Sequence, residues 1–286
     1  MARLCRWVWL VALLLPRISA AAELKFATWN LEWLTDRPAG DRELPSDVQP
    51  KRPEDIDLLQ RYAVDLNADV IGIQEVDGAS IAARVFPRDN YSIHMSHDRV
   101  VQRVGIVVRR GIHYDVNPDV TGFEVGQNDA LRSGVDITLR TDSAPIRILV
   151  VHLKTGCADR RLGGQGPRAC EELGRQVPPL ANWIRARQSE GIAFIVMGDF
   201  NRHMDGHDQL WYTLQRAAPL TRATEGHASP CWGGEAFIDH IILGGAARDW
   251  LEPDSLRVMT YRESGAEWKE RLSDHCPVSV RLRLPG

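Results

Sequence analysis

The chain has 286 residues, 44% of them hydrophobic and 26% charged, and its formal net charge at pH 7 is −3. This length and composition suit one large globular domain of a two-sheet type better than two small ones. A mildly acidic chain cannot hold nucleic acid through overall positive charge, so any such contact must be local.

The first 22 residues differ in composition from the rest of the chain. Arg3 and Arg6 precede an apolar run over residues 7–15, which ends in a stretch of small residues. This pattern predicts a secretory signal peptide, and the run is far shorter than the roughly 20 residues that cross a bilayer. An uncleaved anchor is the alternative. Cleavage removes three arginines and no carboxylate, so the mature chain over residues 23–286 carries a formal charge of −6. We expect an exported protein, periplasmic or secreted, without stable membrane insertion.

The cysteines agree with export. Cys5 leaves with the signal peptide, and Cys157, Cys170, Cys231 and Cys276 remain. An even number of cysteines in an oxidising compartment indicates two disulfides. Three pairings are possible. We favour Cys157 with Cys170, which closes a short loop, and Cys231 with Cys276; four buried thiols are the alternative.

The mature chain opens with an apolar run over residues 24–31 that we predict as a strand. Residues 35–52 contain three prolines among Asp, Arg and Gly, and they predict a loop. A helix is expected from Pro53 onwards, because apolar residues follow at helical spacing. These residues are Ile56, Leu59, Ala63 and Leu66. Residues 69–75 then predict a buried strand that ends in Glu75.

Short apolar runs dominate the rest of the chain, with one predicted helix over residues 172–187. Several runs are joined by turns that contain Gly or Asn, which favours antiparallel pairing. Strands outnumber helices and both are spread along the chain, so we predict two packed sheets with helices outside them. The expected strands are residues 91–95, 104–108, 135–139, 146–152, 193–199, 237–243 and 277–284.

Polar side chains lie at the ends of five of these strands. They are Asn30 with Glu32, Glu75, His152 with Lys154, Asp199 with Asn201, and Asp274 with His275. Asp239 lies inside a sixth apolar run, where a carboxylate is costly unless it is paired. One such residue is more often a turn or capping residue. Because strand ends at one sheet edge converge, the six groups together predict a single cleft.

Six motifs carry a more specific signal, and their order and spacing extend over nearly the whole mature chain. They resemble the successive signatures of the endonuclease/exonuclease/phosphatase superfamily in its deoxyribonuclease I-like, secreted bacterial form. The motifs are Thr-Trp-Asn-Leu-Glu at 28–32, Ile-Gln-Glu-Val at 73–76, Val-His-Leu-Lys at 151–154, Gly-Asp-Phe-Asn-Arg at 198–202, Ile-Asp-His at 238–240 and Ser-Asp-His-Cys-Pro at 273–277. The resemblance implies one catalytic domain, an α/β fold in which two mixed, mostly antiparallel sheets and flanking helices form a four-layered α/β/β/α sandwich.

The resemblance also implies a metal site. Glu75 would supply a hard oxygen ligand for Mg²⁺ or Mn²⁺, and Asn30, Glu32 and Asp274 would complete the shell directly or through water. The ion would neutralise charge that develops on a phosphate. The cysteines show no zinc-like spacing.

Five residues are candidates for catalysis by the same comparison. Asp199 would orient and deprotonate the attacking water, and Asn201 would donate a hydrogen bond to the phosphate or the nucleophile. His275 would contact the phosphate as an imidazolium held by Asp239. His152 matches the histidine that acts as an acid or binds phosphate in the deoxyribonuclease I branch. A core imidazole that is hydrogen-bonded to the backbone is the alternative.

The loop over residues 156–170 follows the His152 motif and carries Arg160, Arg161 and Arg168. With Lys154, these side chains are candidate contacts for substrate phosphates. A solvated loop whose arginines contact nothing is an equally good interpretation.

The leading functional hypothesis is a monomeric, metal-dependent phosphodiesterase that hydrolyses DNA or RNA with little sequence preference, since no motif reads bases in a defined way. The first alternative is a phosphomonoesterase or lipid phosphodiesterase that acts on inositol phosphates or sphingomyelin. A non-catalytic binding module is the second alternative, but every expected ligand and base position is intact.

Overall fold

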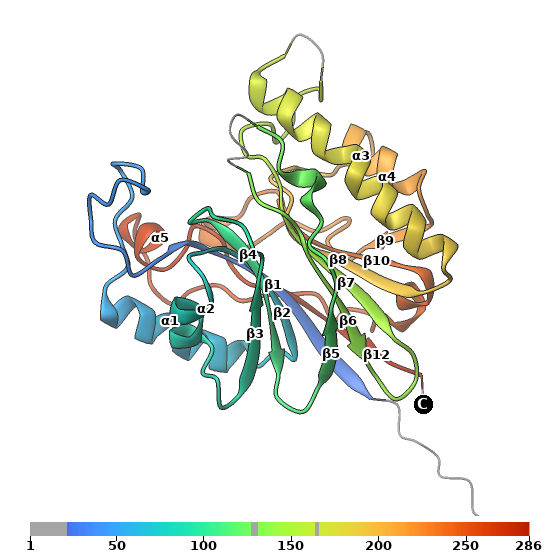
Figure 1. Ribbon diagram of the computed structural model, residues 1–286, viewed down its shortest axis with the longest axis horizontal. Coiled ribbons are helices and arrows are strands. Elements are labelled where there is room, and N and C mark those ends of the chain that lie inside the picture. The colour runs from blue at the N-terminus through green and yellow to red at the C-terminus, as the bar shows by residue number, and fades with distance from the viewer. Residues whose placement is uncertain (1–21, 127–130, 164–165, 286) are drawn as a thin grey trace, which may run out of the picture.

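The computed structural model describes residues 22–126, 131–163 and 166–285 (Figure 1). Apart from Ala22, the predicted signal peptide lies outside these residues. Among the described helices, none combines the length and apolar character that a membrane span requires.

Two six-stranded sheets form the centre of the protein. The first contains, in spatial order, β11 (Arg257–Val258), β12 (Val278–Arg283), β1 (Glu23–Leu34), β2 (Val70–Val76), β4 (Arg103–Arg109) and β3 (Tyr91–Met95). The second contains β5 (His113–Val116), β6 (Val135–Arg140), β7 (Ile146–His152), β8 (Ala193–Asp199), β10 (Asp239–Gly244) and β9 (Leu220–Arg222). Each sheet has one parallel pair, β1 with β2 and β7 with β8, and its other pairs are antiparallel.

The helices cover the outer faces of the two sheets (Figure 1). They are α1 (Pro53–Leu66) and α2 (Ala79–Val85) on the first sheet, α3 (Arg168–Ser189) and α4 (Gln209–Gln215) on the second, and the short α5 (Glu267–Arg271). Phe26, Ile106, Val150 and Met197 pack between the sheets. The predicted four-layered sandwich is confirmed.

Two local predictions differ from the structure. The strand expected at residues 237–243 begins only at Asp239, because Phe237 and Ile238 belong to the connection from Cys231. Asp239 therefore lies at a strand end like the other polar groups, and not inside a strand. The helix expected from residue 172 begins earlier, at Arg168, since Pro167 fits the N-terminal cap.

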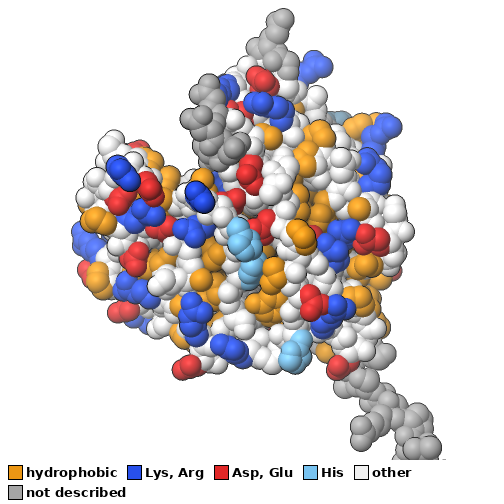
Figure 2. All heavy atoms as spheres, viewed as in Figure 1, with side chains coloured by type: hydrophobic (Ala, Val, Ile, Leu, Met, Phe, Trp, Pro, Cys, Tyr) orange, Lys and Arg blue, Asp and Glu red, His pale blue; other side chains and the backbone are white. Residues whose placement is uncertain are grey.

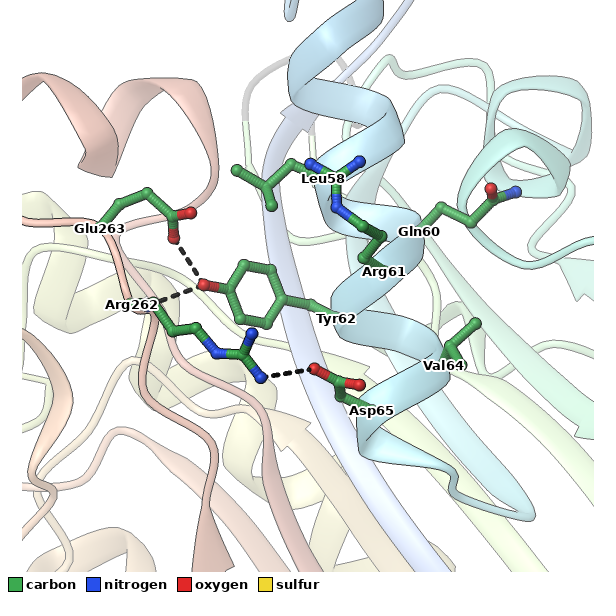
Figure 3. A pocket seen from close by; sticks show the side chains of 8 residues that line it. All are labelled: Leu58, Gln60, Arg61, Tyr62, Val64, Asp65, Arg262 and Glu263. Atoms are coloured by element: carbon green, nitrogen blue, oxygen red, sulfur yellow. Dashed lines mark hydrogen bonds and ion pairs between the residues drawn. The ribbon is translucent and has the colours of Figure 1, made fainter.

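The segment before the last strand is tied to α1 around Tyr62 (Figure 3). The Tyr62 hydroxyl accepts a hydrogen bond from the Arg262 backbone at 2.7 Å and donates one to Glu263 at 2.5 Å. These residues border a hollow of about 320 Å³ whose lining includes none of the predicted site residues. Next to it, the Tyr261 hydroxyl donates to the His275 backbone oxygen at 2.9 Å, so α1 supports the strand end that carries His275.

The favoured cysteine pairing is confirmed: Cys157 is bonded to Cys170, and Cys231 to Cys276. The two bridges close loops of different size, with sequence separations of 13 and 45 residues.

Removing each bridge should therefore cost different amounts of stability. The larger loop gains more freedom in the unfolded chain, so replacing Cys231 and Cys276 by Ser should cost about 4 kcal/mol and replacing Cys157 and Cys170 about 3 kcal/mol. Urea denaturation of the mature proteins measures both values. A loss below about 1 kcal/mol for either pair would show that this bridge does not stabilise the fold.

Candidate active site

The predicted polar groups meet at one edge of the sandwich because the parallel pairs end there. β7, β8 and β10 lie side by side, with His152 opposite Asp199 and Asp199 opposite Asp239. In the other sheet, Asn30 near the end of β1 lies opposite Gln74 at the end of β2. All six motifs therefore contribute to one site.

Gly198 allows β8 to carry Asp199 close against β7. Its φ is +148°, and a Cβ atom at this position would lie 1.9 Å from the Val151 backbone oxygen. Only glycine fits this approach.

Asp199 is the most connected carboxylate of the site. Its side chain is 1% exposed. Asn30 Nδ2 donates to Oδ2 at 3.1 Å, while Asn201 donates its backbone N–H to Oδ1 at 2.7 Å and its side-chain amide to Oδ2 at 3.0 Å. Burial raises the pKa of Asp199 to about 7, against the opposing charge of His275. A carboxylate with such a pKa can take up a proton near neutral pH.

His275 is held by Asp239 and faces Asp199. Nδ1 of the ring lies 2.7 Å from Asp239 Oδ2, and Nε2 lies 3.8 Å from Asp199 Oδ2. Burial alone would lower the pKa of His275, but the charges of Asp239 and Asp199 hold it well above the usual value. The ring is therefore an imidazolium that can donate to an anion from Nε2.

His152 lies on the other side of Asp199. Its Nε2 is 3.5 Å from Asp199 Oδ2 and 3.6 Å from Glu75 Oε1, and its buried Nδ1 has no hydrogen-bond partner. Burial lowers the pKa of His152 well below the usual value, and the charges of Arg132 and His275 lower it further. The ring is neutral, and it is not the backbone-bonded core imidazole considered as the alternative.

Glu75 is positioned by three donors. Asn30 Nδ2 donates to Oε1 at 3.1 Å, while the Trp33 backbone and Gln102 Nε2 donate to Oε2 at 3.2 and 2.5 Å. The sequence interpretation missed Gln102, which precedes a strand that carries no motif.

Glu32 and Asp274 form the outer part of the carboxylate set. The Asp274 backbone N–H donates to Glu32 Oε2 at 3.1 Å, and the Glu32 backbone N–H donates to Asn30 Oδ1 at 2.9 Å. Burial, followed by the charge of Asp274, raises the pKa of Glu32 to about 7. Ionised Glu32 is therefore costly unless a cation is near it.

The donor chemistry decides where a divalent ion fits. Among the described residues, the only compact group of three potential ligands is Asp199, Asp239 and His275, with ligand atoms within 4.8 Å of one another. The ligand atoms of this group already have partners within the protein, since Asp239 Oδ2 is bound to His275 Nδ1 and Asp199 Oδ2 accepts from Asn30 and Asn201. Glu75 and Glu32, with other oxygens beside them, offer the hard donors that Mg²⁺ and Mn²⁺ prefer.

Strained backbone is concentrated in these segments. Of the seven non-glycine residues with positive φ in the described chain, four lie here: Glu32 (41°), Trp33 (49°), Glu75 (60°) and Asn201 (51°). Such conformations cost roughly 1–3 kcal/mol each and persist where the surrounding structure enforces them. Three of the four are predicted ligand or catalytic residues.

Arg132 is a site residue that the sequence interpretation missed. It is 6% exposed and its Nε has no hydrogen-bond partner. Burial lowers the pKa of Arg132, and the charges of Glu75 and Asp199 partly offset this effect. A buried guanidinium with free donors is suited to a bidentate anion such as phosphate. Arg132 precedes β6 by three residues, so the rule used for the other groups, a polar residue next to an apolar strand, would have identified it.

The arginine-rich loop is held at its base but exposed at its tip. Arg202 donates to the Arg160 backbone oxygen at 2.6 Å, whereas the side chains of Arg160 and Arg161 are exposed. Arg168 Nε donates to Glu172 Oε1 at 2.8 Å in the first turns of α3, so its side chain lies along its own helix and does not extend to the site. The predicted Lys154 is half-buried two residues beyond His152.

A comparison with known protein families places the chain. The sequence profile of the Endonuclease/Exonuclease/phosphatase family matches residues 27–275. The chain belongs to this family. Its members are metal-dependent phosphoester hydrolases, and this protein is one of them. No curated protein sequence matches.

Solved structures share the fold. TDP2 from C. elegans has a TM-score of 0.63 at 14% identity, covering 91% of this chain and 75% of its own. The human Nocturnin catalytic domain with bound sulfate anion has a TM-score of 0.57 at 16% sequence identity, and the match covers 91% of this chain and 93% of that one. The 3' phosphatase NExo from Neisseria, bound to a product DNA hairpin, has a TM-score of 0.59 at 17% sequence identity, and the match covers 91% of this chain and 99% of that one.

Replacing Asp199 by Asn should separate chemistry from stability. We expect turnover to fall by several powers of ten, because the amide cannot accept the proton of the attacking water. The melting temperature should change by only a few degrees, because the substitution removes a buried charge but turns one amide NH2 towards the donors of Asn30 and Asn201. Steady-state rates and thermal denaturation of the same preparation measure both. Turnover within about tenfold of the wild type would remove Asp199 from the mechanism.

His240, which follows Asp239, is structural. Its Nδ1 accepts a hydrogen bond from the Thr224 hydroxyl at 2.6 Å, and its Nε2 donates to the Arg202 backbone oxygen at 3.0 Å. Burial lowers the pKa of His240 to about 3. The neutral ring therefore links β10 to the turn after Asp199.

This depressed pKa predicts a pH-dependent stability. The contribution of neutral His240 to the free energy of unfolding is fully present above pH 6.5, the ordinary pKa of histidine. It is lost as the pH falls towards about 3, because between these two values the unfolded chain protonates His240 and the folded chain does not. At pH 5 the loss should be about 2 kcal/mol. Chemical denaturation of wild type and His240→Gln at pH 8 and at pH 5 tests this prediction. The difference in unfolding free energy between the two proteins should be about 2 kcal/mol smaller at pH 5 than at pH 8. A gap independent of pH would contradict it.

Proposed function

We propose that the protein is an exported, divalent-metal-dependent phosphodiesterase that hydrolyses nucleic acid with little sequence preference. The observation that carries the proposal is the set of donors around Asp199. Arg132 has a buried Nε without a partner and His275 is an imidazolium, so a phosphoryl group would be bound from two sides, while the Asn201 amide donates to Asp199 and to the Leu153 backbone oxygen.

The residues have separable tasks. Glu75, Glu32, Asn30 and Asp274 would hold Mg²⁺ or Mn²⁺, which when bound neutralises charge on the phosphoryl oxygens. Asp199 would orient the water and accept its proton, with Asn201 holding the carboxylate in place.

The remaining groups stabilise the phosphate. His275 would donate from Nε2 to the phosphoryl oxygen or the leaving oxygen, while Asp239 keeps the ring charged. Arg132 would bind a non-bridging oxygen of the phosphate. Neutral His152 would donate to the phosphate from Nε2, which lies on the Glu75 side of the site.

Support for nucleic acid comes from the neighbours. Lys and Arg are scattered among Asp and Glu over the face shown in Figure 2, so any contact with phosphates there would be local. NExo is a neighbour bound to DNA. Two disulfides, and a signal peptide predicted from the sequence, support export.

A phosphomonoesterase is the second candidate. A hollow of about 150 Å³ adjoins His275, with Asp239, Asp274 and Lys269 in its lining, and it could accept a terminal group. NExo is described as a 3' phosphatase.

The test compares plasmid DNA, bis-p-nitrophenyl phosphate and a phosphomonoester panel, each with Mg²⁺ or Mn²⁺ and with excess chelator. We expect chelator-sensitive nicking of plasmid that disappears in His275→Ala. Arg132→Ala should reduce nicking by roughly a hundredfold, whereas Arg185→Ala, on the exposed face of α3, should change it less than about threefold. Inert DNA with a cleaved monoester would establish the second candidate, and inert substrates throughout would refute both.

A further inference from the structure

β2 is irregular at the point where it carries Glu75. Its pairing with β4 changes register by one residue between Ile73 and Val76, which lie opposite Gly105 and Arg103. Glu75 lies within this bulge and has a φ of 60°. A bulge redirects a side chain relative to its neighbours on the strand, and bulges are common next to active sites. The direction of the Glu75 side chain is therefore set locally, by the groups that contact it.

Gln102 lies across from this bulge, because it directly precedes Arg103 at the start of β4. Arg103 attaches the backbone on either side of Gln102 to β2. Its Nε donates to the Val100 backbone oxygen at 3.0 Å, and its Nη2 donates to Asp77 Oδ1 at 3.3 Å. Asp77 follows Glu75 by two residues, and its side chain is only 6% exposed. The connection before β4 is thus fixed to the segment that carries Glu75.

The Gln102 side chain occupies one of the two oxygens of Glu75. Nε2 donates to Oε2 at 2.5 Å, and a carboxylate can only accept, so the amide NH2 group must face it. Oε2 also accepts from the Trp33 backbone at 3.2 Å. Among the described residues, Oε1 accepts one hydrogen bond, from Asn30 Nδ2 at 3.1 Å. Since each carboxylate oxygen has about two lone-pair sites, both sites of Oε2 are filled and a free site is left on Oε1.

This arrangement bears on the choice of ion. Ca²⁺ is large, takes many oxygen ligands and often binds both oxygens of one carboxylate, whereas Mg²⁺ requires a compact octahedral shell. Mn²⁺ also suits an octahedral set of oxygens. A carboxylate with a free site on one oxygen alone is therefore better suited to the smaller ions than to Ca²⁺.

We propose that Gln102 is a positioning residue that makes Glu75 a one-oxygen ligand and thereby favours Mg²⁺ and Mn²⁺ over Ca²⁺. Without the amide, Oε2 regains a lone-pair site, so both oxygens of Glu75 become able to bind one ion. The carboxylate also loses a restraint on its orientation, which weakens binding of an ion that requires a fixed shell. The inference rests on the proposed metal dependence, and it is independent of the substrate.

The experiment measures the binding of Mn²⁺ and of Ca²⁺ to the mature protein by calorimetry, with no substrate present. Gln102→Met keeps the length of the side chain and removes the donor, and Gln102→Leu removes the donor with a different shape. Gln60→Met is the matched control, because Gln60 Nε2 also bonds an oxygen across two elements, the Arg84 backbone oxygen at 3.1 Å, but it lies on α1.

Gln102→Met should bind Mn²⁺ roughly tenfold more weakly than wild type and Ca²⁺ equally well or more tightly. The ratio of the Ca²⁺ and Mn²⁺ dissociation constants should therefore fall about tenfold, whereas in Gln60→Met both constants should stay within about twofold. If Gln102→Met does not fold, Gln102→Leu supplies the same comparison.

A purely structural role of Gln102 would weaken the binding of both ions equally. A ratio that stays within about twofold of wild type in the Gln102 variants would thus overturn the inference and leave the proposed function untouched. Absence of Mn²⁺ binding to wild type would overturn the proposed metal dependence, and the inference with it. The two failures are therefore distinguishable.

Discussion

The arrangement of the site depends on one constraint: the Asp199 carboxylate is buried and must be satisfied. A buried carboxylate without partners is strongly unfavourable, so the surrounding groups are donors. Asn30 comes from the first sheet, Asn201 from the turn after β8, and His275 from the start of the last strand. The same contacts that satisfy Asp199 therefore join the two sheets at their common edge.

Charge divides the site into two halves on either side of Asp199. In one half, Asp239 and His275 form a pair whose positive charge lies next to Asp199. In the other half, Glu75, Glu32 and Asp274 gather negative charge, and burial makes that charge costly at Glu32. A divalent ion would offset this charge, and a phosphate between the halves would contact that ion on one side and His275 on the other.

Strain and support coincide in the same segments. The positive φ values of Glu32, Trp33 and Glu75 occur where backbone N–H groups and side-chain oxygens bind one another across β1 and β2. α1 supports this edge from outside through Tyr62, and Tyr261 connects that support to His275. The outer helices therefore do more than cover the sheets, since they stabilise the strand ends that carry the chemistry.

The sequence by itself determined the family, the four layers and most of the residues that converge, whereas it only favoured the cysteine pairing that the structure contains. It did so because polar side chains after apolar strands are local signals, and their order along the chain was specific. Gln102 carried no such signal, because it lies outside the six motifs and acquires its role from its hydrogen bond to Glu75. Arg132 does precede an apolar strand, but it also lies outside the six motifs. Only the tertiary structure decided which charges are buried together, because burial and charge pairing depend on how strands and loops from distant parts of the chain pack around Asp199 and Glu75.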